Sequence, residues 1–570
     1  MTDPVLKITG LTVEIPTRRG VVRPVRDVSW DIRPGEIVGV VGESGAGKSM
    51  TGNAVIGLLD RPAHISAGEI DLDGRRIDDL PEREKARIRG RRIAMIFQDP
   101  LTSLNPLFTV GQQLVETIRA HLDVSAGEAR ERAVALLDRV GIPDPGTRVD
   151  QYPHQFSGGM RQRVVIALAL CAEPEVVVAD EPTTALDVSI QAQILDLIRE
   201  LARERGMGVM LVTHDMGVIA ETTDRVNVMY DGEIVESGPT ARVLGAPEHP
   251  YTQSLVAAVP RPDRKLRRFP QVSYGGRETA FRIEDLARDW PARPAGDGPF
   301  LEARGLTKRF LEKGSLIPSR RRWFTAVDDA SFAIRPGEVF GLVGESGSGK
   351  STIARMIAGL YPLDEGEVRF EGEVVAGAGA TEAARDAYRS QVQMIFQDPF
   401  SSLNPRHRVD RIVAEPALHL GVIPKANVTA RVGELLDRVG LGAEAGLKYP
   451  HEFSGGQRQR ISIARALATQ PRFLICDEPT SALDVSIQAQ ILNILKDLQE
   501  HLGLTMLFIS HDLPVVRQMC DRVGVLKDGR LVEVAETARL FEAPEHPYTR
   551  ELISLMPKTD LLSNAGLAAE

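Results

Sequence analysis

Two stretches of the chain have the residue types and spacing of a loop that binds nucleotide phosphates. Both read Gly-x4-Gly-Lys-Ser, at 42–49 and 344–351, and each follows an apolar β-branched run and opens a helical stretch. Glycine lets backbone N–H groups wrap the phosphates, and the helix N-terminus adds a favourable dipole. The lysine would reach the β- and γ-phosphates, and the serine would bind Mg²⁺. The predicted phosphate-binding residues of the two loops are Gly42, Ser44, Gly45, Gly47, Lys48, Ser49, Gly344, Ser346, Gly347, Gly349, Lys350 and Ser351.

An acidic pair follows a second apolar run in each half of the chain. Val-Val-Val-Ala precedes Asp180 and Glu181, and Phe-Leu-Ile-Cys precedes Asp477 and Glu478. One carboxylate of such a pair can lie near a metal ion, and the next can lie near the γ-phosphate and polarise water. A strand that ends in Asp-Glu is by itself a common strand-to-loop transition. Its combination with the phosphate loop predicts an ATP site.

The chain is a repeat of one domain. Four segments of the first half recur in order in the second: 27–49 as 329–351, 96–106 as 395–405, 152–163 as 449–460, and 179–195 as 476–492. We therefore expect a first domain at 1–259, a linker at 260–299 and a second domain at 300–570. The linker is rich in Pro, Arg, Gly and Asp, which predicts an irregular connector that wraps the first domain.

The elements that must position these residues alternate along each half. Short β-branched runs, such as 37–41, 176–179 and 209–212, are separated by helical stretches. Such alternation predicts an α/β fold with a parallel sheet and helices on its faces.

Composition excludes several classes of protein. Hydrophobic residues make up 43% of the chain, which excludes wholesale disorder, and no apolar run has the length of a membrane-spanning helix. The N-terminus lacks the pattern of a secretory signal, and three cysteines without a CxxC pair fit a reducing cytoplasm. With 69 basic and 78 acidic residues the formal charge is −9, which argues against a bulk nucleic-acid binder.

Further motifs carry a family resemblance. Ser-Gly-Gly precedes an Arg-Gln-Arg helix in each half, and this element is similar to the signature motif of ATP-binding-cassette (ABC) ATPases. The Q-loop glutamine, D-loop and switch histidine of that family are also matched in order. The matching residues are Ser157, Gly158, Gly159, Ser454, Gly455 and Gly456 (signature), Gln98 and Gln397 (Q-loop), 185–187 and 482–484 (D-loop), and His214 and His511 (switch).

The resemblance implies two P-loop NTPase cassettes of the ABC type in one chain. Each would have a helical subdomain, at about 100–170 and 399–467, and a C-terminal extension. Two ATP molecules would lie head to tail between the cassettes, with the phosphate loop of one facing the signature of the other within the same chain. Met160 stands where Gln457 stands in the second copy, so we expect two active sites with modest asymmetry.

The resemblance also implies roles for the remaining site residues. The catalytic residues would be Glu181, Glu478, His214 and His511. The Mg²⁺ ligands would be Ser49, Gln98, Asp180, Ser351, Gln397 and Asp477.

A repeated Ala-Pro-Glu-His-Pro-Tyr-Thr element, at 246–252 and 543–549, narrows the family. Physically it predicts only a proline-fixed turn that docks a helix. It resembles the C-terminal extension of the oligopeptide, dipeptide and nickel importer ATPases, and the fused arrangement is most similar to the glutathione and peptide import ATPases. The alternative is a soluble tandem-cassette ATPase that acts on ribosomes or nucleic acid. The acidic charge and the absence of a long charged helix in the connector disfavour it.

An importer implies partners that this chain does not contain. These are two integral-membrane permease subunits and an extracytoplasmic solute-binding protein, without nucleic acid, and the ATPase would be peripheral at the cytoplasmic face of the inner membrane. Segments 99–106 and 398–405 would lie near a groove for a permease helix, although their composition equally fits ordinary turns. We expect no iron–sulfur cluster, because no cysteine lies between Cys171 and Cys476 or after Cys520.

Overall fold

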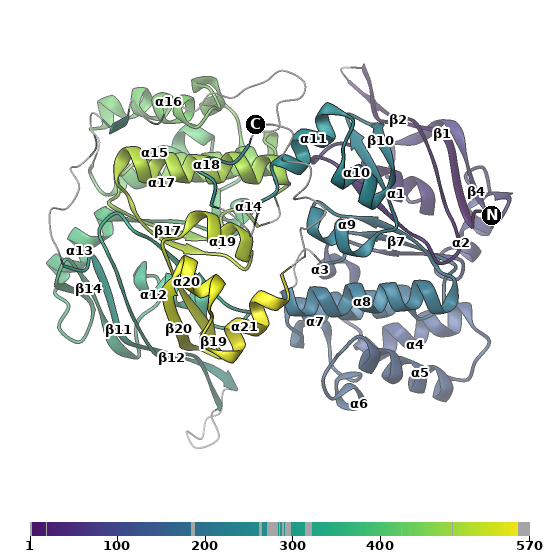
Figure 1. The fold of residues 1–570 in the computed structure, drawn as a ribbon, viewed down its shortest axis with the longest axis horizontal. Coiled ribbons are helices and arrows are strands. Elements are labelled where there is room, and N and C mark those ends of the chain that lie inside the picture. Colours follow the sequence, from purple (N-terminus) through teal and green to yellow (C-terminus); the bar gives the residue numbers. More distant parts are fainter. Residues whose placement is uncertain are drawn as a thin grey trace. The chain divides into compact units, whose positions relative to one another are not determined.

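The computed structural model describes residues 3–18, 20–183, 188–261, 265–270, 283, 286–287, 290, 298–313, 322–422, 424–481 and 483–556. These residues form two compact units, the first within Met1–Val259 and the second within Pro260–Met556. The first unit is purple to teal in Figure 1 and the second is teal to yellow, and they repeat the same strands in the same order, with helix α6 of the first unit replaced by a 3-10 helix in the second.

A six-stranded sheet lies at the centre of each unit. Its strands in the first unit are β3 (Ile37–Val41), β6 (Ile93–Ile96), β7 (Val176–Asp180), β8 (Gly208–Val212), β9 (Arg225–Tyr230) and β10 (Glu233–Pro239). In the second unit they are β13 (Val339–Val343), β16 (Val392–Ile395), β17 (Phe473–Asp477), β18 (Thr505–Ile509), β19 (Arg522–Lys527) and β20 (Arg530–Glu536). The order is β10-β9-β3-β8-β7-β6, and β16-β17-β18-β13-β19-β20 is the same order reversed. All pairs are parallel except β10 with β9 and β20 with β19, so the predicted parallel sheet is confirmed with one antiparallel edge strand.

A four-stranded antiparallel sheet, which the sequence analysis did not predict, covers one side of each unit. It consists of β1 (Leu6–Thr17), β2 (Gly20–Ile32), β4 (His64–Leu72) and β5 (Arg75–Arg76), and of β11 (Leu301–Lys313), β12 (Arg322–Ile334), β14 (Glu365–Phe370) and β15 (Glu373–Gly377). The accompanying helices are α1 (Lys48–Ile56), α2 (Glu82–Ile88), α12 (Lys350–Ile357) and α13 (Glu382–Gln391).

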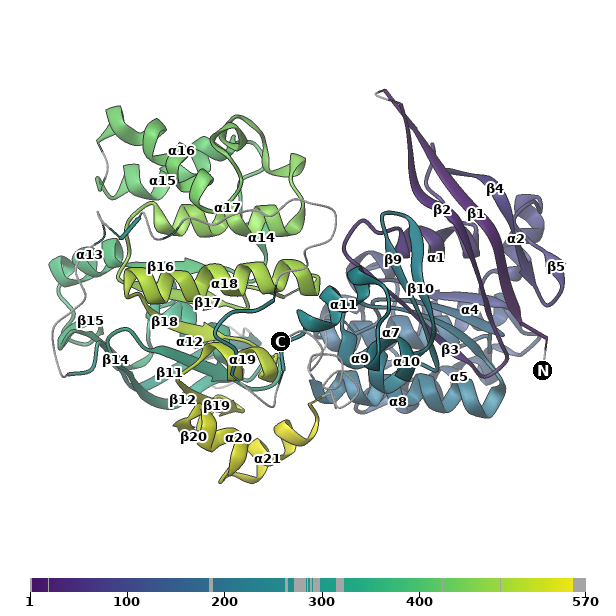
Figure 2. The same cartoon turned by 45° about the horizontal axis from the view of Figure 1, so that its top comes forward.

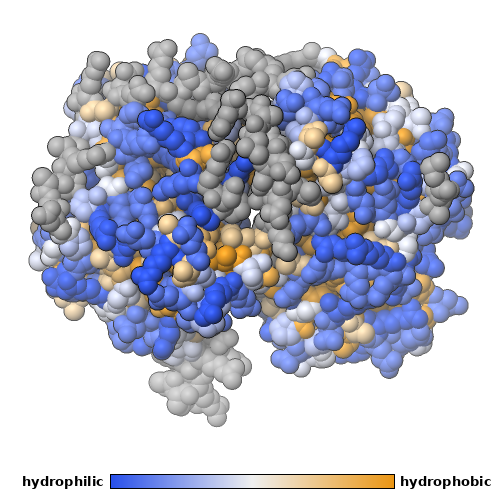
Figure 3. Space-filling view, in the orientation of Figure 1, coloured by the Kyte–Doolittle hydropathy of each residue, from blue (hydrophilic) through white to orange (hydrophobic). Residues whose placement is uncertain are grey.

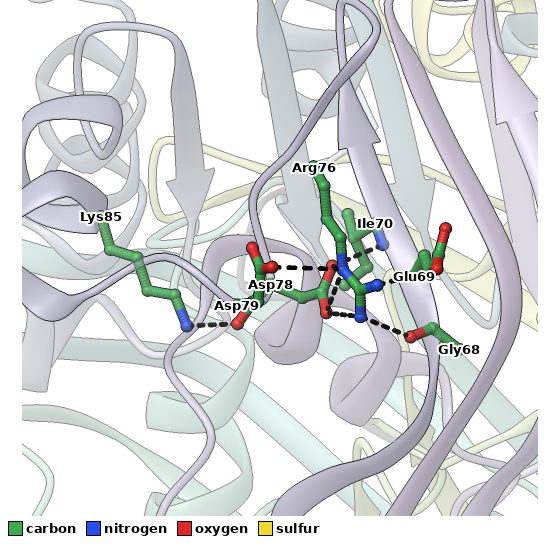
Figure 4. A network of polar contacts seen from close by, with 7 residues as sticks. All are labelled: Gly68, Glu69, Ile70, Arg76, Asp78, Asp79 and Lys85. Carbon is green, nitrogen blue, oxygen red and sulfur yellow. Dashed lines mark hydrogen bonds and ion pairs between the residues drawn. The ribbon is translucent and has the colours of Figure 1, made fainter.

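A polar network fixes the outer edge of this sheet in the first unit (Figure 4). The Arg76 guanidinium donates to the carboxylates of Asp78, at 2.9 Å, and Glu69, at 2.7 Å. Asp78 also accepts from the backbone N–H of Ile70, and Lys85 donates to the Asp78 carbonyl at 2.7 Å. The network therefore joins β4, β5 and α2.

Alternate residues of the central strands fill two separate cores. Val176 and Val178 of β7 pack toward the antiparallel sheet, whereas Val177 and Ala179 pack toward the helices on the other face. All five residues of β7 are buried, as expected for a parallel strand covered on both faces.

Helices cover the face of the central sheet that is opposite the antiparallel sheet. In the first unit they are α3 (Pro100–Ser103), α4 (Val110–His121), α5 (Ala126–Arg139), α6 (Pro145–Arg148), α7 (Gly158–Leu170) and α8 (Val188–Arg205). In the second they are α14 (Pro399–Ser402), α15 (Val409–His419), α16 (Val428–Arg438), α17 (Gly455–Leu467) and α18 (Val485–Leu502). Figures 1 and 2 both show α15 and α16 beyond α17, on the side away from the sheet.

Short helices end each unit. They are α9 (Met216–Thr222), α10 (Thr240–Gly245) and α11 (Pro250–Ala257), and α19 (Leu513–Met519), α20 (Thr537–Glu542) and α21 (Pro547–Ser554). No described helix is both long and apolar enough to cross a membrane. The face drawn in Figure 3 is mostly hydrophilic, with small scattered apolar areas.

The prediction that the linker wraps the first domain is wrong for its described beginning, which packs on the second unit. The backbone of Phe269 exchanges two 2.9 Å hydrogen bonds with the Asn493 side chain of α18, and the ring is 2% exposed. Arg268 binds Asp497 and Glu500 of the same helix at 2.6 and 2.7 Å. Composition indicated an irregular segment, but it could not indicate which surface would bury Phe269.

We expect Phe269→Ala to lower the free energy of unfolding of the second unit by about 3 kcal/mol, because it empties a buried aromatic site. Denaturant unfolding of the full chain measures this change. Phe324→Ala on β12 is the control, because this ring is 54% exposed. An equal effect of both substitutions would contradict the docking of the linker.

Candidate functional site

The predicted site residues, apart from those of the signature motif, lie at the carboxyl ends of four neighbouring strands. In the first unit the phosphate loop follows β3, Gln98 follows β6, Asp180 ends β7 and His214 follows β8. These strands are parallel neighbours, so their carboxyl ends meet at one edge of the sheet, where open α/β sheets bind ligands. The second unit repeats the arrangement.

Both phosphate loops require glycine at two positions. A Cβ on Gly42 would lie 2.1 Å from a backbone oxygen, and a Cβ on Gly47 would lie 2.3 Å from another. The φ angles of these two glycines are +151° and +100°. A Cβ on Gly344 or Gly349 would lie 2.2 or 2.4 Å from the equivalent oxygens. Any side chain would force the backbone to move, so close packing and the backbone conformation both allow only glycine at these positions.

The open side of each loop is formed by its middle residues. Ser44 and Gly45 are exposed in the first unit, as are Ser346 and Gly347 in the second. A Cβ on either of these glycines would meet nothing within 4 Å. A phosphate group can therefore approach the backbone of the loop from this side.

The motif lysine lies buried against its own loop. Lys48 is 8% exposed, and its Nζ donates to the carbonyls of Gly42 and Glu43 at 2.8 and 2.9 Å. Lys350 makes the same pair of bonds at 2.7 and 2.8 Å. The ammonium groups therefore lie inside the phosphate cradle.

The next serine and the strand-end aspartate are in contact. Ser49 Oγ donates to Asp180 Oδ1 at 3.0 Å, and Ser351 Oγ donates to Asp477 Oδ1 at 2.9 Å. Burial raises the pKa of both aspartates above its usual value, although the serine hydrogen bonds act in the opposite direction. A buried carboxylate of this kind is stabilised by a cation.

The glutamates are held by the predicted glutamines and histidines. Glu181 accepts from Gln98 Nε2 at 2.8 Å, and its other oxygen is 3.1 Å from His214 Nδ1. The second unit brings Gln397 and His511 to Glu478 with the same distances, although both contacts there are with one oxygen, Oε2.

The backbone of each glutamate has a left-handed conformation. The φ angles of Glu181 and Glu478 are 49° and 48°, which is uncommon for glutamate. Their N–H groups donate to the carbonyls of Val212 and Ile509 on the neighbouring strand, at 2.8 and 2.9 Å. Unusual backbone held by a neighbouring strand is characteristic of functional sites.

The histidines and glutamates stabilise each other's charged forms. Burial alone would lower the pKa of His214 and His511, but the hydrogen bond and charge of the glutamate outweigh it and raise the pKa of both. Burial would likewise raise the pKa of Glu478, but the bond and charge of His511 outweigh it and lower the pKa. Glu478 is therefore kept as an oriented carboxylate.

The signature residues begin the helices α7 and α17. Ser157 Oγ caps α7 through the Met160 N–H, with Gly158 and Gly159 as the first helical residues. Ser454 caps α17 in the same way ahead of Gly455 and Gly456, and here Gln457 also bonds back to the Ser454 N–H at 3.0 Å. The Met160 difference thus removes one hydrogen bond, which is the local origin of the expected asymmetry.

The signature helices are joined to the acidic pairs of their own units. Gln162 donates to the Pro182 carbonyl at 2.9 Å, and Gln459 donates to the Pro479 carbonyl at 2.8 Å. The D-loop prediction at 185–187 and at Ala482 lies outside the described residues.

The three cysteines are buried and unpaired, and burial raises the pKa of the Cys171 thiol to about 12. Across the described ranges, no group of three or more His, Cys, Asp or Glu side chains is placed to hold a metal ion. The expected absence of an iron–sulfur cluster stays a prediction.

A tyrosine missed by the sequence analysis reaches each phosphate loop. Tyr251 Oη accepts the backbone N–H of Glu43 at 2.9 Å, and Tyr548 Oη accepts that of Glu345 at 3.2 Å. Both belong to the repeated His-Pro-Tyr element. Its repetition was visible in the sequence, but its contact with a loop about 200 residues away was not.

Comparisons with known proteins identify the family of the chain. The family model "ABC transporter" matches residues 25–184 and 327–481, and "Oligopeptide/dipeptide transporter, C-terminal region" matches 235–279 and 532–566. The glutathione import ATP-binding protein GsiA of Salmonella typhimurium is 47% identical over 98% of this chain and 90% of the relative. The protein of that name from Escherichia coli is 45% identical over 97% and 89%. Among solved structures, an ATP-binding cassette bound to ADP and Pi is 30% identical over 41% of this chain and 98% of that chain, with a TM-score of 0.39.

Proposed function

Because the chain belongs to the ATPases of the ABC transporter family, with an oligopeptide/dipeptide transporter C-terminal region after each cassette, we propose that it energises the import of glutathione or short peptides. The observation that carries this proposal is the similarity to glutathione import ATPases over nearly the whole chain, and the Ser–Asp contact repeated beside both phosphate loops supports it. The chain would be peripheral at the cytoplasmic face of the inner membrane, beside two permease subunits and a solute-binding protein.

The residues present suit Mg²⁺ beside the nucleotide. In each unit a serine hydroxyl and a buried carboxylate, Ser49 with Asp180 and Ser351 with Asp477, offer hard oxygen ligands. Mg²⁺ is commonly held by one or two protein groups, with phosphate oxygens and water as the other ligands. Gln98 and Gln397 lie next to the same sites through their bonds to the glutamates and would add amide oxygens. The ion would neutralise charge on the β- and γ-phosphates.

The glutamate would act as the general base of hydrolysis. Glu181, held by Gln98 and His214, would accept the proton of the attacking water while the phosphate loop and Lys48 bind the β- and γ-phosphates. The raised pKa of the histidine favours a charged imidazolium, which can stabilise negative charge near the γ-phosphate. Glu478 would do the same in the second unit.

ATP would join the two units. The capped N-termini of α7 and α17 offer N–H groups to a γ-phosphate bound by the opposite phosphate loop. Binding of ATP would close the pair and hydrolysis would open it, so that the γ-phosphate drives a two-state switch.

Reconstitution in liposomes with its cognate permeases and binding protein tests the function. We expect glutathione or a short peptide, loaded on the binding protein, to stimulate ATP hydrolysis and to accumulate in the vesicles. Stimulation by RNA or ribosomes, without any response to loaded binding protein, would support the rival class of tandem ATPases and overturn the proposal.

The segments 99–106 and 398–405 would contact the cytoplasmic helices of the permeases, and their surroundings differ. The first is followed by Leu107 and Phe108, which are 79% and 46% exposed. The second is followed by Arg406 and His407, which line a cleft of about 550 Å³ between α15 and α16. An apolar permease helix would fit the first unit, and an acidic one would fit the second.

We expect Leu107→Ser/Phe108→Ser and, separately, Arg406→Glu to reduce import at least about tenfold, because each changes the chemistry of a proposed contact. ATP hydrolysis by the purified chain alone, measured without permeases and without detergent, should stay unchanged. Val22→Ser is the matched control, because Val22 is 52% exposed on β2. Full import by both variants would contradict the assignment of these contacts.

A further inference from the structure

The His-Pro-Tyr element contacts the phosphate loop in both units. Its tyrosine hydroxyl accepts a hydrogen bond from the backbone N–H of Glu43 or Glu345. This residue directly follows the first glycine of the loop. We propose that Tyr251 and Tyr548 are positioning residues, which hold the phosphate loops in the conformation that binds ATP.

The tyrosine and the lysine fix opposite ends of the same loop residue. The N–H of Glu43 donates to Tyr251 Oη, and its carbonyl accepts from Lys48 Nζ at 2.9 Å. In the second unit the Glu345 carbonyl accepts from Lys350 at 2.8 Å. The tyrosine therefore fixes the loop residue whose carbonyl accepts a hydrogen bond from the phosphate-binding lysine.

The tyrosine is itself held rigidly. Tyr251 is 0% exposed, and its ring lies 4.6 Å from that of Tyr230 on β9, measured between centroids. Tyr548 is 4% exposed, and the equivalent strand offers Lys527, whose Nζ lies 4.5 Å from the ring centroid. Different neighbours thus hold the same hydroxyl in the same place.

A chain of hydrogen bonds joins the tyrosine back to the central sheet. The Tyr251 N–H donates to His249 Nδ1 at 3.2 Å, and the N–H groups of Glu248 and His249 donate to the Glu236 carboxylate of β10 at 3.0 and 3.1 Å. The second unit repeats every bond, with Glu533, Glu545, His546 and Tyr548.

A role confined to anchoring the extension would require only the ring. Tyr→Phe keeps the ring and its packing, and removes the acceptor from the loop N–H. A half-buried N–H that loses its acceptor makes its conformation less favourable, so the loop is expected to shift toward conformations that bind phosphate poorly. Nucleotide affinity, and not only stability, should therefore respond to the hydroxyl.

The test is the double variant Tyr251→Phe/Tyr548→Phe in the full chain. We expect the Kd for Mg-ATP, measured by displacement of a fluorescent ATP analogue, and the KM of hydrolysis to rise about five- to twentyfold, as for the loss of one buried hydrogen bond. The kcat at saturating ATP should stay within about twofold, because bound ATP re-forms the loop.

Tyr388→Phe is the matched control. The Tyr388 hydroxyl is equally buried and donates to the Ile357 carbonyl at 2.9 Å, at the far end of the helix that follows the second loop. It should lower the unfolding temperature without changing KM. An unchanged KM in the double variant, or an equal rise in the control, would overturn the proposal. If the double variant does not fold, each single variant tests it, because half of the ATP sites should weaken and the other half should not.

Discussion

Glu181→Gln and Glu478→Gln are each expected to cut ATP turnover severely, and together by about 10²–10⁴-fold, the usual contribution of a general base. The amide has nearly the shape of the carboxylate and can still accept a hydrogen bond from Gln98 or Gln397, but it cannot take the proton of water. ATP binding should therefore persist. Release of phosphate and equilibrium binding of ATP, measured on the same preparations, separate the two effects.

Glu338→Gln provides the control for this result. Glu338 is a buried glutamate of the second unit that pairs with Arg522 and accepts from the Arg335 N–H, away from the phosphate loop. Its substitution should lower stability without lowering turnover per folded molecule. Near-full activity in either catalytic variant would refute the prediction of two hydrolytic sites.

The parts of the site that could be predicted are those with local rules. Glycine spacing after an apolar strand marks a phosphate loop, and an apolar strand that ends in Asp-Glu marks its acidic partner. Parallel strand order then brings Gln98, Glu181 and His214 together, since β6, β7 and β8 are neighbours. The sequence alone therefore predicted the central sheet, and the phosphate-loop, Gln, Asp-Glu and His residues that it named meet at one edge.

The parts that could not be predicted depend on distant contacts. The alternation of β1 is interrupted by register shifts around Gly10, so the antiparallel sheet left no clean pattern of period two. Phe269 lies in a linker rich in Pro, Arg, Gly and Asp, and the α18 residue that binds its backbone lies more than 200 residues away. Tyr251 likewise bonds to a loop 208 residues earlier, so its motif could identify a family but not a contact.

Lys48→Met together with Lys350→Met should raise the Kd for Mg-ATP by about 10–100-fold, because charge-assisted hydrogen bonds to phosphate contribute about 1.5–3 kcal/mol. In this structure each Nζ donates to two carbonyls of its own phosphate loop. It can therefore exchange these bonds for bonds to the phosphates without leaving the site. Methionine fills the same space and keeps the loop packed. The lost affinity would therefore report the ammonium group itself.

Lys496→Met separates this effect from the general cost of removing a buried lysine. Lys496 is 7% exposed, burial lowers the pKa of its ammonium to about 8, and its Nζ donates to the linker carbonyl of Leu266 at 2.6 Å. Its loss should weaken linker docking and leave ATP binding unchanged. Calorimetric titration with Mg-ATP distinguishes the two variants. If the double phosphate-loop variant bound ATP as tightly as the parent chain, the lysines would be structural groups that support the loop from within, and the site would have to bind phosphate through backbone N–H groups alone.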